Sequence, residues 1–312
     1  MTALTIAHLS DVHLAPITGF TPRHWNVKRA LGYANWLRHR RASFDATALE
    51  RLLADLKAAR PDHIALTGDL VNIGLPQEHI NALAWLERLG PPERVSVVPG
   101  NHDIYARLRS DPGTERWARY MASDEGAPPP SHDQRFPYLR RLGRVALIGI
   151  NSAVPTPPLI AAGRIGQTQL RRLAAHLDAL GRSGDFRLVL IHHPPLPGQA
   201  RRSRGLKDAE ELQALLMRHG AELVIHGHNH RAMLSWCVTP QGHAPVVGAP
   251  AAALRPTKRE APLARYNLYH IAGPPWTIEL IGRGLRQAAG PVLEIERHRL
   301  RFLPHEKRSW QA

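Results

Sequence analysis

The chain has 312 residues, 43% of them hydrophobic and 21% charged, so it can bury a full core and is not disordered throughout. Its 41 Lys and Arg against 26 Asp and Glu give a formal charge of +15, which favours anionic partners. The single cysteine, Cys237, excludes both an internal disulfide and a metal site built from thiolates.

The sequence predicts no transmembrane helix and no signal peptide. Pro155, Pro157 and Pro158 interrupt the longest apolar candidate, near residues 145–162. Residues 1–13 lack the basic start of a secretory leader. We therefore expect a cytoplasmic protein, with peripheral contact at the inner membrane surface left open.

Residues 4–9 predict a first strand, which is followed by Asp11 and His13. Residues 16–44 then form an insertion, within which 23–41 combine aromatic and basic side chains. A helix there would place Trp25, Gly32 and Trp36 beside Lys28 and Arg29, opposite a second face. That second face contains Val27, Ala30, Leu31, Ala34 and Leu37, and one of the two faces would dock on the body. The aromatic face would either pack or meet an anionic membrane or a nucleic acid.

A β-α-β pattern follows the insertion. Residues 46–59 predict an amphipathic helix, and strand 63–67 leads to Gly68 and Asp69. Helix 78–89 precedes strand 95–98, which leads to the run Gly100, Asn101, His102 and Asp103. In open α/β sheets, ligands bind at the carboxyl ends of the strands, where these polar residues stand.

The second half of the chain continues this pattern. Residues 104–141 predict a cap or long loop over the site. Strand 145–150, helix 168–180 and strand 187–191 lead to His192 and His193, and helix 207–219 leads to strand 223–225. That strand ends on three histidines, His226, His228 and His230.

Short β-like runs occupy residues 232–312, at 233–238, 245–247, 266–271, 277–281 and 292–302. We expect them to form a second sheet that closes the fold on itself. The basic tail 297–308 is typical of a solvated edge strand. No composition shift marks a boundary, so residues 1–312 are expected to form one domain.

Five strand ends thus carry metal-binding residue types. Each motif alone is weak, because an isolated Asp or His is usually a turn or packing residue. Their order, D-x-H, G-D, G-N-H-D, H and G-H-x-H, resembles that of the calcineurin-like metallophosphoesterase family over residues 4–231. We accordingly expect an α/β fold, a four-layer α-β-β-α sandwich of two mixed β-sheets flanked by helices.

The resemblance implies two divalent transition metal ions, with Mn, Fe, Zn and Co all compatible with oxygen and imidazole ligands. One metal would be held by Asp11, His13 and His230, the other by Asn101, His192 and His228, and Asp69 would bridge them. His193 remains a rival to His192. His226 has no place in the pattern, and we interpret it as a packing or supporting residue.

The implied chemistry is attack of a bridging hydroxide on phosphorus. His102 would stabilise the transition state or protonate the leaving group. Asp103 would either orient His102 or cap the following turn.

The residues 192–195, His-His-Pro-Pro, and their spacing to Gly227 favour the bacterial phosphodiesterase branch, whose members hydrolyse cyclic nucleotides and glycerophosphodiesters. Our leading hypothesis is therefore hydrolysis of a phosphodiester in a phosphorylated small molecule. The alternative is a membrane-associated pyrophosphatase acting on a UDP-2,3-diacylglucosamine-like lipid, with residues 23–41 at an anionic membrane. A nuclease or nucleic-acid-binding metalloprotein ranks third, because no compact DNA-binding motif is present, and a non-catalytic metal scaffold ranks last.

Overall fold

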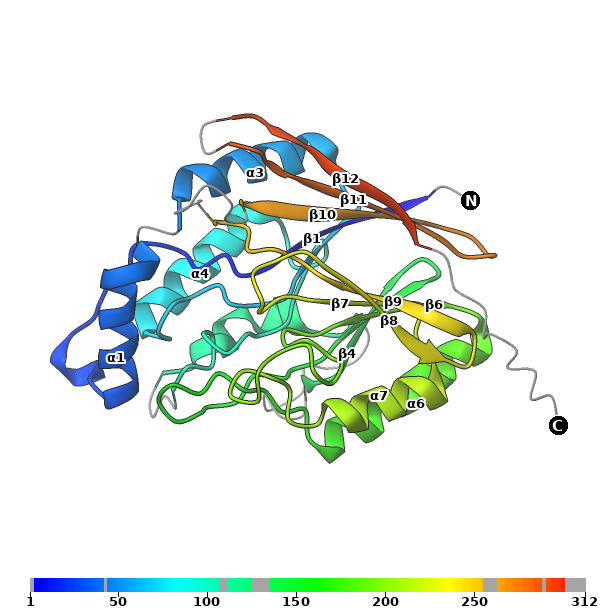
Figure 1. Cartoon of the computed structure of the whole chain (residues 1–312), viewed down its shortest axis with the longest axis horizontal. Coiled ribbons are helices and arrows are strands. Elements are labelled where there is room, and N and C mark those ends of the chain that lie inside the picture. Colours follow the sequence, from blue (N-terminus) through cyan, green and yellow to red (C-terminus); the bar gives the residue numbers. More distant parts are fainter. Residues whose placement is uncertain are drawn as a thin grey trace.

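Two six-stranded mixed β-sheets lie face to face, with helices flanking them (Figure 1). The structure, a computed structural model, describes residues 3–41, 44–106, 111–124, 135–254, 263–287 and 290–300. The described architecture is the predicted four-layer α/β sandwich, so the fold class is confirmed.

The first sheet has the order β12-β11-β10-β1-β2-β3. Its strands are β1 (Leu4–Leu9), β2 (His63–Leu66), β3 (Val95–Val97), β10 (Arg265–Ala272), β11 (Thr277–Leu285) and β12 (Val292–Leu300). The neighbours β1, β2 and β3 run parallel, and β10 joins the other side of β1 in antiparallel register, with Ala7 opposite Leu268.

The second sheet has the order β4-β5-β6-β7-β9-β8. Its strands are β4 (Tyr138–Leu142), β5 (Val145–Gly149), β6 (Phe186–Leu190), β7 (Leu223–His226), β8 (Met233–Thr239) and β9 (Gly242–Gly248). The four central strands β5, β6, β7 and β9 are parallel.

The helices supply the outer layers. Helices α3 (Ala46–Ala59) and α4 (Pro76–Leu89) pack on the first sheet. Helices α6 (Gln167–Ser183) and α7 (Ala209–His219) pack on the second sheet (Figure 1). Strand β6 alternates between two cores: Leu188 and Leu190 join the cluster shared by both sheets, whereas Val189 joins the cluster under α6 and α7. This period of two explains why the run is apolar on both faces.

The C-terminal strands differ from the prediction that they form a second sheet of their own. They divide between both sheets: β9 pairs with β7, whereas β10 pairs with β1. Alternating apolar residues predict strands but do not specify which sheet edge they join. Strand β12 lies at the edge of its sheet, as expected for residues 297–300, and the remainder of the 297–308 tail lies outside the described residues.

Within the predicted cap, 104–141, Tyr105 lines a cavity beside His102, whereas residues 111–124 pack against the body. A 3₁₀ helix, Gly113–Met121, buries Trp117, Tyr120 and Met121, and Trp117 donates its indole N–H to His79 O at 3.0 Å. Strand β4 pairs with β5. Residues 107–110 and 125–134, which belong to the same prediction, lie outside the described residues.

The insertion is helical as predicted, and it docks on the body through the face that carries Arg29 and Trp36. After a short 3₁₀ turn, Pro22–His24, come α1 (Val27–Asn35) and a π-helical turn, Trp36–Arg40. Arg29 and Trp36 are buried, and the Arg29 guanidinium donates to Gly74 O at 2.7 Å. A Cβ on Gly32 would lie 2.3 Å from Tyr105 Oη, so this face must pack on the body.

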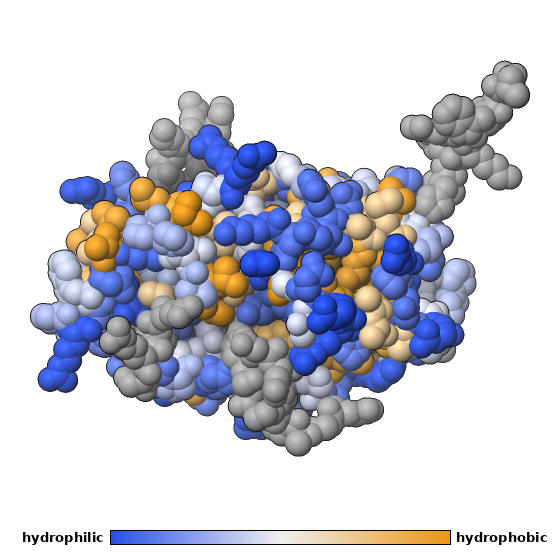
Figure 2. Space-filling model, turned by 90° about the horizontal axis from the view of Figure 1, so that it is seen from below, coloured by the Kyte–Doolittle hydropathy of each residue, from blue (hydrophilic) through white to orange (hydrophobic). Residues whose placement is uncertain are grey.

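The aliphatic face of α1 is instead exposed. Val27 is 70% exposed and Leu31 47%, and nearby Trp25 is 62% exposed. Figure 2 shows hydrophobic side chains gathered at the end of the molecule where α1 lies. The buried Arg29 and its carbonyl partners, which no periodicity reveals, determine the orientation. Among the described helices, none is both long and apolar enough to cross a membrane.

Candidate metal centre

The ends of β1, β2, β6 and β7 and the turn after β3 converge between the two sheets. They bring together the seven residues predicted as ligands: Asp11, His13, Asp69, Asn101, His192, His228 and His230. The convergence follows from topology, because parallel strands end at the same edge of each sheet.

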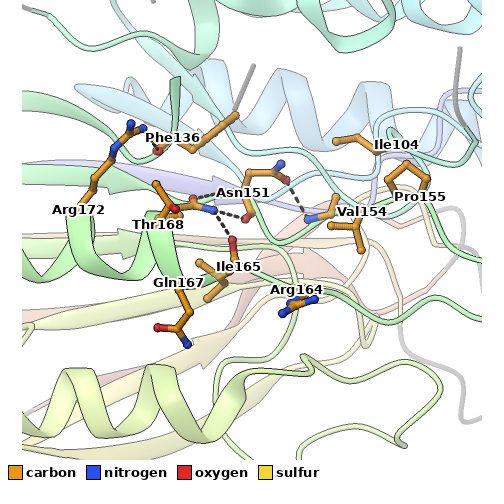
Figure 3. Close-up of a pocket in the computed structure, with 13 residues that line it drawn as sticks. Ile104, Phe136, Asn151, Val154, Pro155, Arg164, Ile165, Gln167, Thr168 and Arg172 are labelled. Carbon is orange, nitrogen blue, oxygen red and sulfur yellow. Dashed lines mark hydrogen bonds between the residues drawn. The ribbon is translucent and has the colours of Figure 1, made fainter. Parts of the chain in front are cut away.

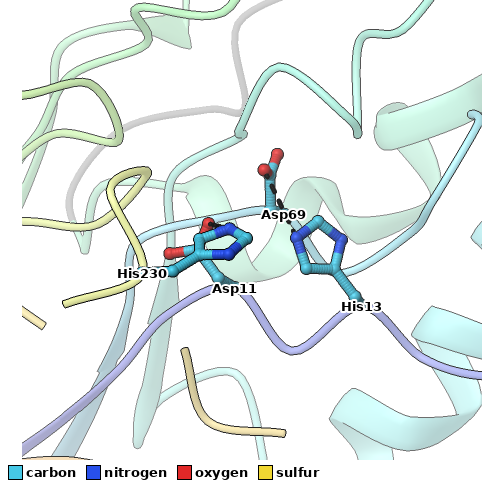
Figure 4. Close-up of side chains that lie close together, drawn as sticks. All are labelled: Asp11, His13, Asp69 and His230. Atoms are coloured by element: carbon cyan, nitrogen blue, oxygen red, sulfur yellow. Dashed lines mark ion pairs between the residues drawn. The ribbon is translucent and has the colours of Figure 1, made fainter. Parts of the chain in front are cut away.

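The first group consists of Asp11, His13, Asp69 and His230, whose ligand atoms all lie within 4.8 Å of one another (Figure 4). His230 Nε2 is 3.1 Å from Asp11 Oδ1, and His13 Nε2 is 3.7 Å from Asp69 Oδ2. Such a cluster of carboxylate and imidazole can hold a divalent cation.

The second group shares Asp69 with the first and adds His192 and His228. His192 Nε2 lies 3.5 Å from Asp69 Oδ2, 3.2 Å from His228 Nδ1 and 3.2 Å from Asn101 Oδ1. Asp69 therefore stands between two sets of potential ligands.

Backbone carbonyls orient two of the imidazoles. His13 Nδ1 is 3.1 Å from Val71 O, and His192 Nδ1 is 2.6 Å from Thr67 O. A carbonyl only accepts, so each Nδ1 carries the proton and each Nε2 presents a lone pair towards Asp69.

The electrostatics fit a bound cation. Burial lowers the pKa of His13 and of His228, which keeps both rings in the neutral form that binds metals. Burial and the like charge of Asp11 raise the pKa of Asp69. Burial also acts to raise the pKa of Asp11, but His230 and the other nearby histidines hold it well below its ordinary value.

Buried polar atoms without hydrogen-bond partners also indicate that the centre fits a bound cation. In the part of the chain that the structure describes, the buried Nε2 atoms of His13 and His228 have no hydrogen-bond partner. A buried polar atom without a partner costs about 1–3 kcal/mol. A cation between these ligands would remove that cost, so the donor set fits a divalent metal.

The backbone at the centre is strained. Five of the predicted ligands adopt positive φ angles that non-glycine residues rarely occupy: Asp11 (53°), His13 (44°), Asp69 (57°), His228 (69°) and His230 (55°). Each such conformation costs on the order of 1–3 kcal/mol and clusters at functional sites.

Glycines permit the close approach that the centre requires. A Cβ on Gly227 would lie 1.8 Å from Ser10 Oγ and 2.6 Å from Asp11 Oδ2. A Cβ on Gly100 would lie 2.2 Å from Asp69 Oδ1. Both positions therefore exclude any side chain.

The sequence suggested that Asp103 orients His102 or caps the following turn, but its carboxylate accepts hydrogen bonds from neither. Its carboxylate accepts from the backbone N–H groups of Asp69, Leu70 and Gly100 at 2.8 Å each, and of Val71 at 3.1 Å. Burial and the nearby Asp69 raise the pKa of Asp103 to about 7, while these N–H groups act against the rise. Asp103 thus holds the turn that carries Asp69.

His102 borders the centre. Its backbone N–H donates to Asp69 Oδ1 at 2.7 Å, and its Nδ1 contacts Asn72 O. The Nε2 atom faces Arg40 Nη1 at 3.0 Å. Burial and Arg40 lower the pKa of His102.

The other two histidines, His193 and His226, belong to neither ligand cluster. Both ring nitrogens of His193 are engaged, with Ser152 Oγ at 2.8 Å and Ala161 O at 3.1 Å. His226 is buried, and its ring packs against Gly248. The structure therefore brings His192 to the ligand cluster rather than His193.

Sequence reasoning missed the arginines that line the site, Arg40 and Arg204 among them. Arg40, from the insertion, and Arg204, from the loop after Pro195, line a cavity of 340 Å³ together with Asp69, His102 and His228. Neither belongs to a motif, and their only signal was the surplus of positive charge in these segments. A larger cavity of 610 Å³, lined by Phe136, Asn151, Arg164 and others, contains none of the seven predicted ligands (Figure 3).

Comparison with family models matches residues 4–232 to the calcineurin-like phosphoesterase model. A probable cyclic nucleotide phosphodiesterase of Synechococcus is 29% identical over 214 residues, 68% of this chain and 72% of that protein. A glycerophosphodiester phosphodiesterase of Enterobacter lignolyticus is 29% identical over 179 residues, 56% of this chain and 58% of that protein.

Solved structures show the same fold. A dimetal phosphatase from Danio rerio aligns with a TM-score of 0.61 at 15% identity, over 95% of this chain and 99% of that one. A purple acid phosphatase from yellow lupin seeds aligns at 0.55 with 14% identity, over 94% of this chain and 53% of the other.

Proposed function

This chain belongs to the calcineurin-like phosphoesterase family and is a hydrolase of phosphate esters, and from that premise we propose that it hydrolyses a phosphodiester at a dinuclear metal centre. The observation that carries the proposal is the position of Asp69, whose carboxylate belongs to both ligand clusters. A carboxylate shared by two cations offsets their repulsion.

In this proposal Asp11, His13 and His230 hold one metal, Asn101, His192 and His228 hold the other, and Asp69 bridges them. The distances support a shared carboxylate, because His13 Nε2 of the first set and His192 Nε2 of the second both lie near Asp69 Oδ2, at 3.7 Å and 3.5 Å. The metal identity stays open among Mn, Fe, Zn and Co.

When bound, two such metals lower the pKa of a water and polarise a phosphoryl oxygen. The chain's own residues then orient and neutralise the substrate. Because Asn72 O engages Nδ1 of His102, Nε2, which lies 3.0 Å from Arg40 Nη1, is the ring atom through which His102 would act on the leaving oxygen. Arg40 stands beside that Nε2 and supplies positive charge where the phosphate would carry negative charge. Asp103 acts as a positioning residue through the turn of Asp69.

The phosphodiester class is supported by the names of the two relatives, one a cyclic nucleotide and one a glycerophosphodiester phosphodiesterase. Neither the metal ligands nor the fold identifies which phosphodiester is hydrolysed, since one fold serves many substrates.

A metal and substrate panel tests the proposal. We expect the protein loaded with Mn, Zn or Fe to hydrolyse bis(p-nitrophenyl) phosphate faster than p-nitrophenyl phosphate. Elemental analysis should give two metals per chain. Asp69→Asn should lower kcat/KM at least about 100-fold and lower the metal content, because it removes the shared carboxylate.

Asp178→Asn, on the outer surface of α6, is the matched control and should change neither quantity. One metal per chain in a fully active protein would overturn the dinuclear centre. A preference for the monoester would overturn the phosphodiester.

The exposed apolar surface of the insertion favours a second candidate, a lipid-linked pyrophosphate substrate taken from an anionic membrane. Leu159, which is 88% exposed, and Leu31 stand at the rim of a cavity that reaches His102. Basic residues 23, 28 and 38 lie in the same segment. Apolar and basic side chains together suit a membrane interface.

Flotation with vesicles containing phosphatidylglycerol tests this candidate. The double variant Trp25→Ala/Leu31→Ser should bind vesicles about ten-fold more weakly than the unaltered protein, because it removes exposed apolar area. Met217→Ser, an exposed apolar position on α7, is the control. No vesicle binding by the unaltered protein would eliminate the candidate.

A further inference from the structure

A second cavity opens beside the candidate metal centre, on the side of the insertion. It has a volume of 260 Å³ and shares Arg40, Asn101, His102 and Arg204 with the cavity over the ligands. Its outer wall is formed by the insertion and by residues 159–161. A ligand phosphate at the metals would therefore lie next to this space.

Among the described residues, the wall of this second cavity carries three cations, Lys28, Arg40 and Arg204. No Asp or Glu is among the described residues that line it. Within the described ranges, no ion pair joins any of the three to a carboxylate. We call this space the cationic cavity.

Neutral neighbours hold two of these cations in place. Lys28 Nζ donates to Thr156 Oγ1 at 2.8 Å and lies 4.4 Å above the centre of the Tyr105 ring. Arg40 Nη1 reaches His102 Nε2 at 3.0 Å. These contacts position the cations without a direct ion pair, although Asp69 and Asp11 lie close enough to act on Arg40 electrostatically.

Like charges that lie close together repel one another. Burial lowers the pKa of Arg40, Arg204 adds to that effect, and Asp69 and Asp11 act against it. An anion in the cavity would turn the repulsion into attraction, and guanidinium groups bind phosphate through paired N–H donors. The arrangement therefore favours a ligand with concentrated negative charge beyond the scissile phosphate.

We propose that the cationic cavity binds a second phosphoryl group of the substrate, adjacent to the phosphate at the metal centre. This inference rests on the proposed function and specifies its substrate class. The second group is either the other half of an internal diphosphate or a terminal phosphate on the same molecule. Both present the same chemistry to Lys28, Arg40 and Arg204.

Calorimetric titration of three uridine ligands tests this inference on the metal-loaded protein. UMP carries one phosphate, UDP adds a terminal phosphate, and the α,β-methylene analogue of UDP-glucose presents an internal diphosphate that cannot be cleaved at that bridge. We expect UDP, the analogue or both to bind about 10- to 100-fold more tightly than UMP, the effect of one or two charge-assisted hydrogen bonds. A gain for UDP alone indicates a terminal phosphate, and a gain for the analogue indicates an internal diphosphate.

Arg204→Ala should reduce that preference about ten-fold, and Arg204→Lys should retain part of it. Arg202→Ala is the matched control, because Arg202 is exposed on the same loop and lines neither cavity. Equal binding of all three ligands by the unaltered protein, or equal loss in Arg204→Ala and Arg202→Ala, would overturn the inference. Intact hydrolysis of bis(p-nitrophenyl) phosphate in that case would leave the proposed function standing, whereas absent hydrolysis would count against the function itself.

Discussion

The carboxylate of Asp103 accepts hydrogen bonds from four backbone N–H groups, and three of them belong to the turn of residues 69–71. In Asp103→Asn, one oxygen becomes an NH₂ group that cannot accept. We expect the free energy of unfolding to fall by about 3 kcal/mol, because buried N–H donors lose a charged acceptor. Metal affinity should fall about 10-fold as Asp69 shifts.

Urea denaturation and metal titration measure these two effects. Asp62→Asn is the control: Asp62 is exposed and accepts from Thr5 N at 2.7 Å. Its loss should be below about 1 kcal/mol. Equal losses in the two variants would contradict the role assigned to Asp103.

His63, which is not one of the proposed metal ligands, makes the free energy of unfolding depend on pH. It is fully buried in β2 and lies 2.8 Å from Ser96 Oγ, and burial, with Arg140 and Arg94 nearby, lowers its pKa to about 3. The folded chain keeps this ring neutral, whereas the unfolded chain takes up a proton below about pH 6.5. The contribution of the neutral His63 ring to the free energy of unfolding is therefore complete above pH 6.5 and is lost as the pH falls towards 3.

Urea titrations of the unaltered protein and His63→Gln at pH 7, 6 and 5, with chelator present, test this sign. Between pH 6.5 and 5 the free energy of unfolding should fall more steeply in the unaltered protein, by roughly 1.4 kcal/mol per pH unit. Parallel curves would show that His63 does not control this pH dependence.

At the scale of elements, α1 and the π-helical turn after it divide their side chains between packing on the body and exposure to solvent. Trp36 is buried and stacks on Tyr33, whereas Leu31 and Leu37 are exposed. Trp36→Ala should therefore lower the free energy of unfolding by about 3–5 kcal/mol. Leu31→Ser should change it by less than about 0.5 kcal/mol. Thermal unfolding of both variants checks this difference, and a larger loss in Leu31→Ser would reverse the assigned orientation.

The same element marks the limit of the sequence reasoning. Helical periodicity predicted the helix and its two faces but did not decide which face packs on the body. The actual contact relies on Arg29 donating to carbonyls of Ile73 and Gly74, partners that are distant in sequence. The strand ends were predictable, because short motifs follow each apolar run and parallel strands must end together.

Arg40 and Arg204 could not be assigned in the same way. Each reaches the candidate centre from a segment without a motif, and only the fold brings them beside His102. The proposed metal ligands could therefore be predicted from the sequence. The arginines that would contact the rest of the substrate could not.

At the scale of the whole molecule, both sheets depend on the C-terminal third. The family model ends at residue 232, yet β10 covers one side of β1 and β9 covers one side of β7. Strand β10 also contributes Tyr266, Leu268 and Tyr269 to the shared core. The ligand-bearing strands thus lie inside sheets that later residues complete.

A chain cut after residue 232 should consequently fail to fold, although it retains all seven proposed ligands. Removing β8 to β12 exposes the inner edges of β1 and β7 and leaves backbone N–H and C=O groups without partners. Circular dichroism should show no cooperative thermal transition, and metal titration should show no tight binding. Because β12 is an edge strand, a chain cut after residue 287 is the informative comparison and should still unfold cooperatively, at a lower temperature. Cooperative unfolding of the 232-residue chain would show that the metal centre needs only the segment matched by the family model.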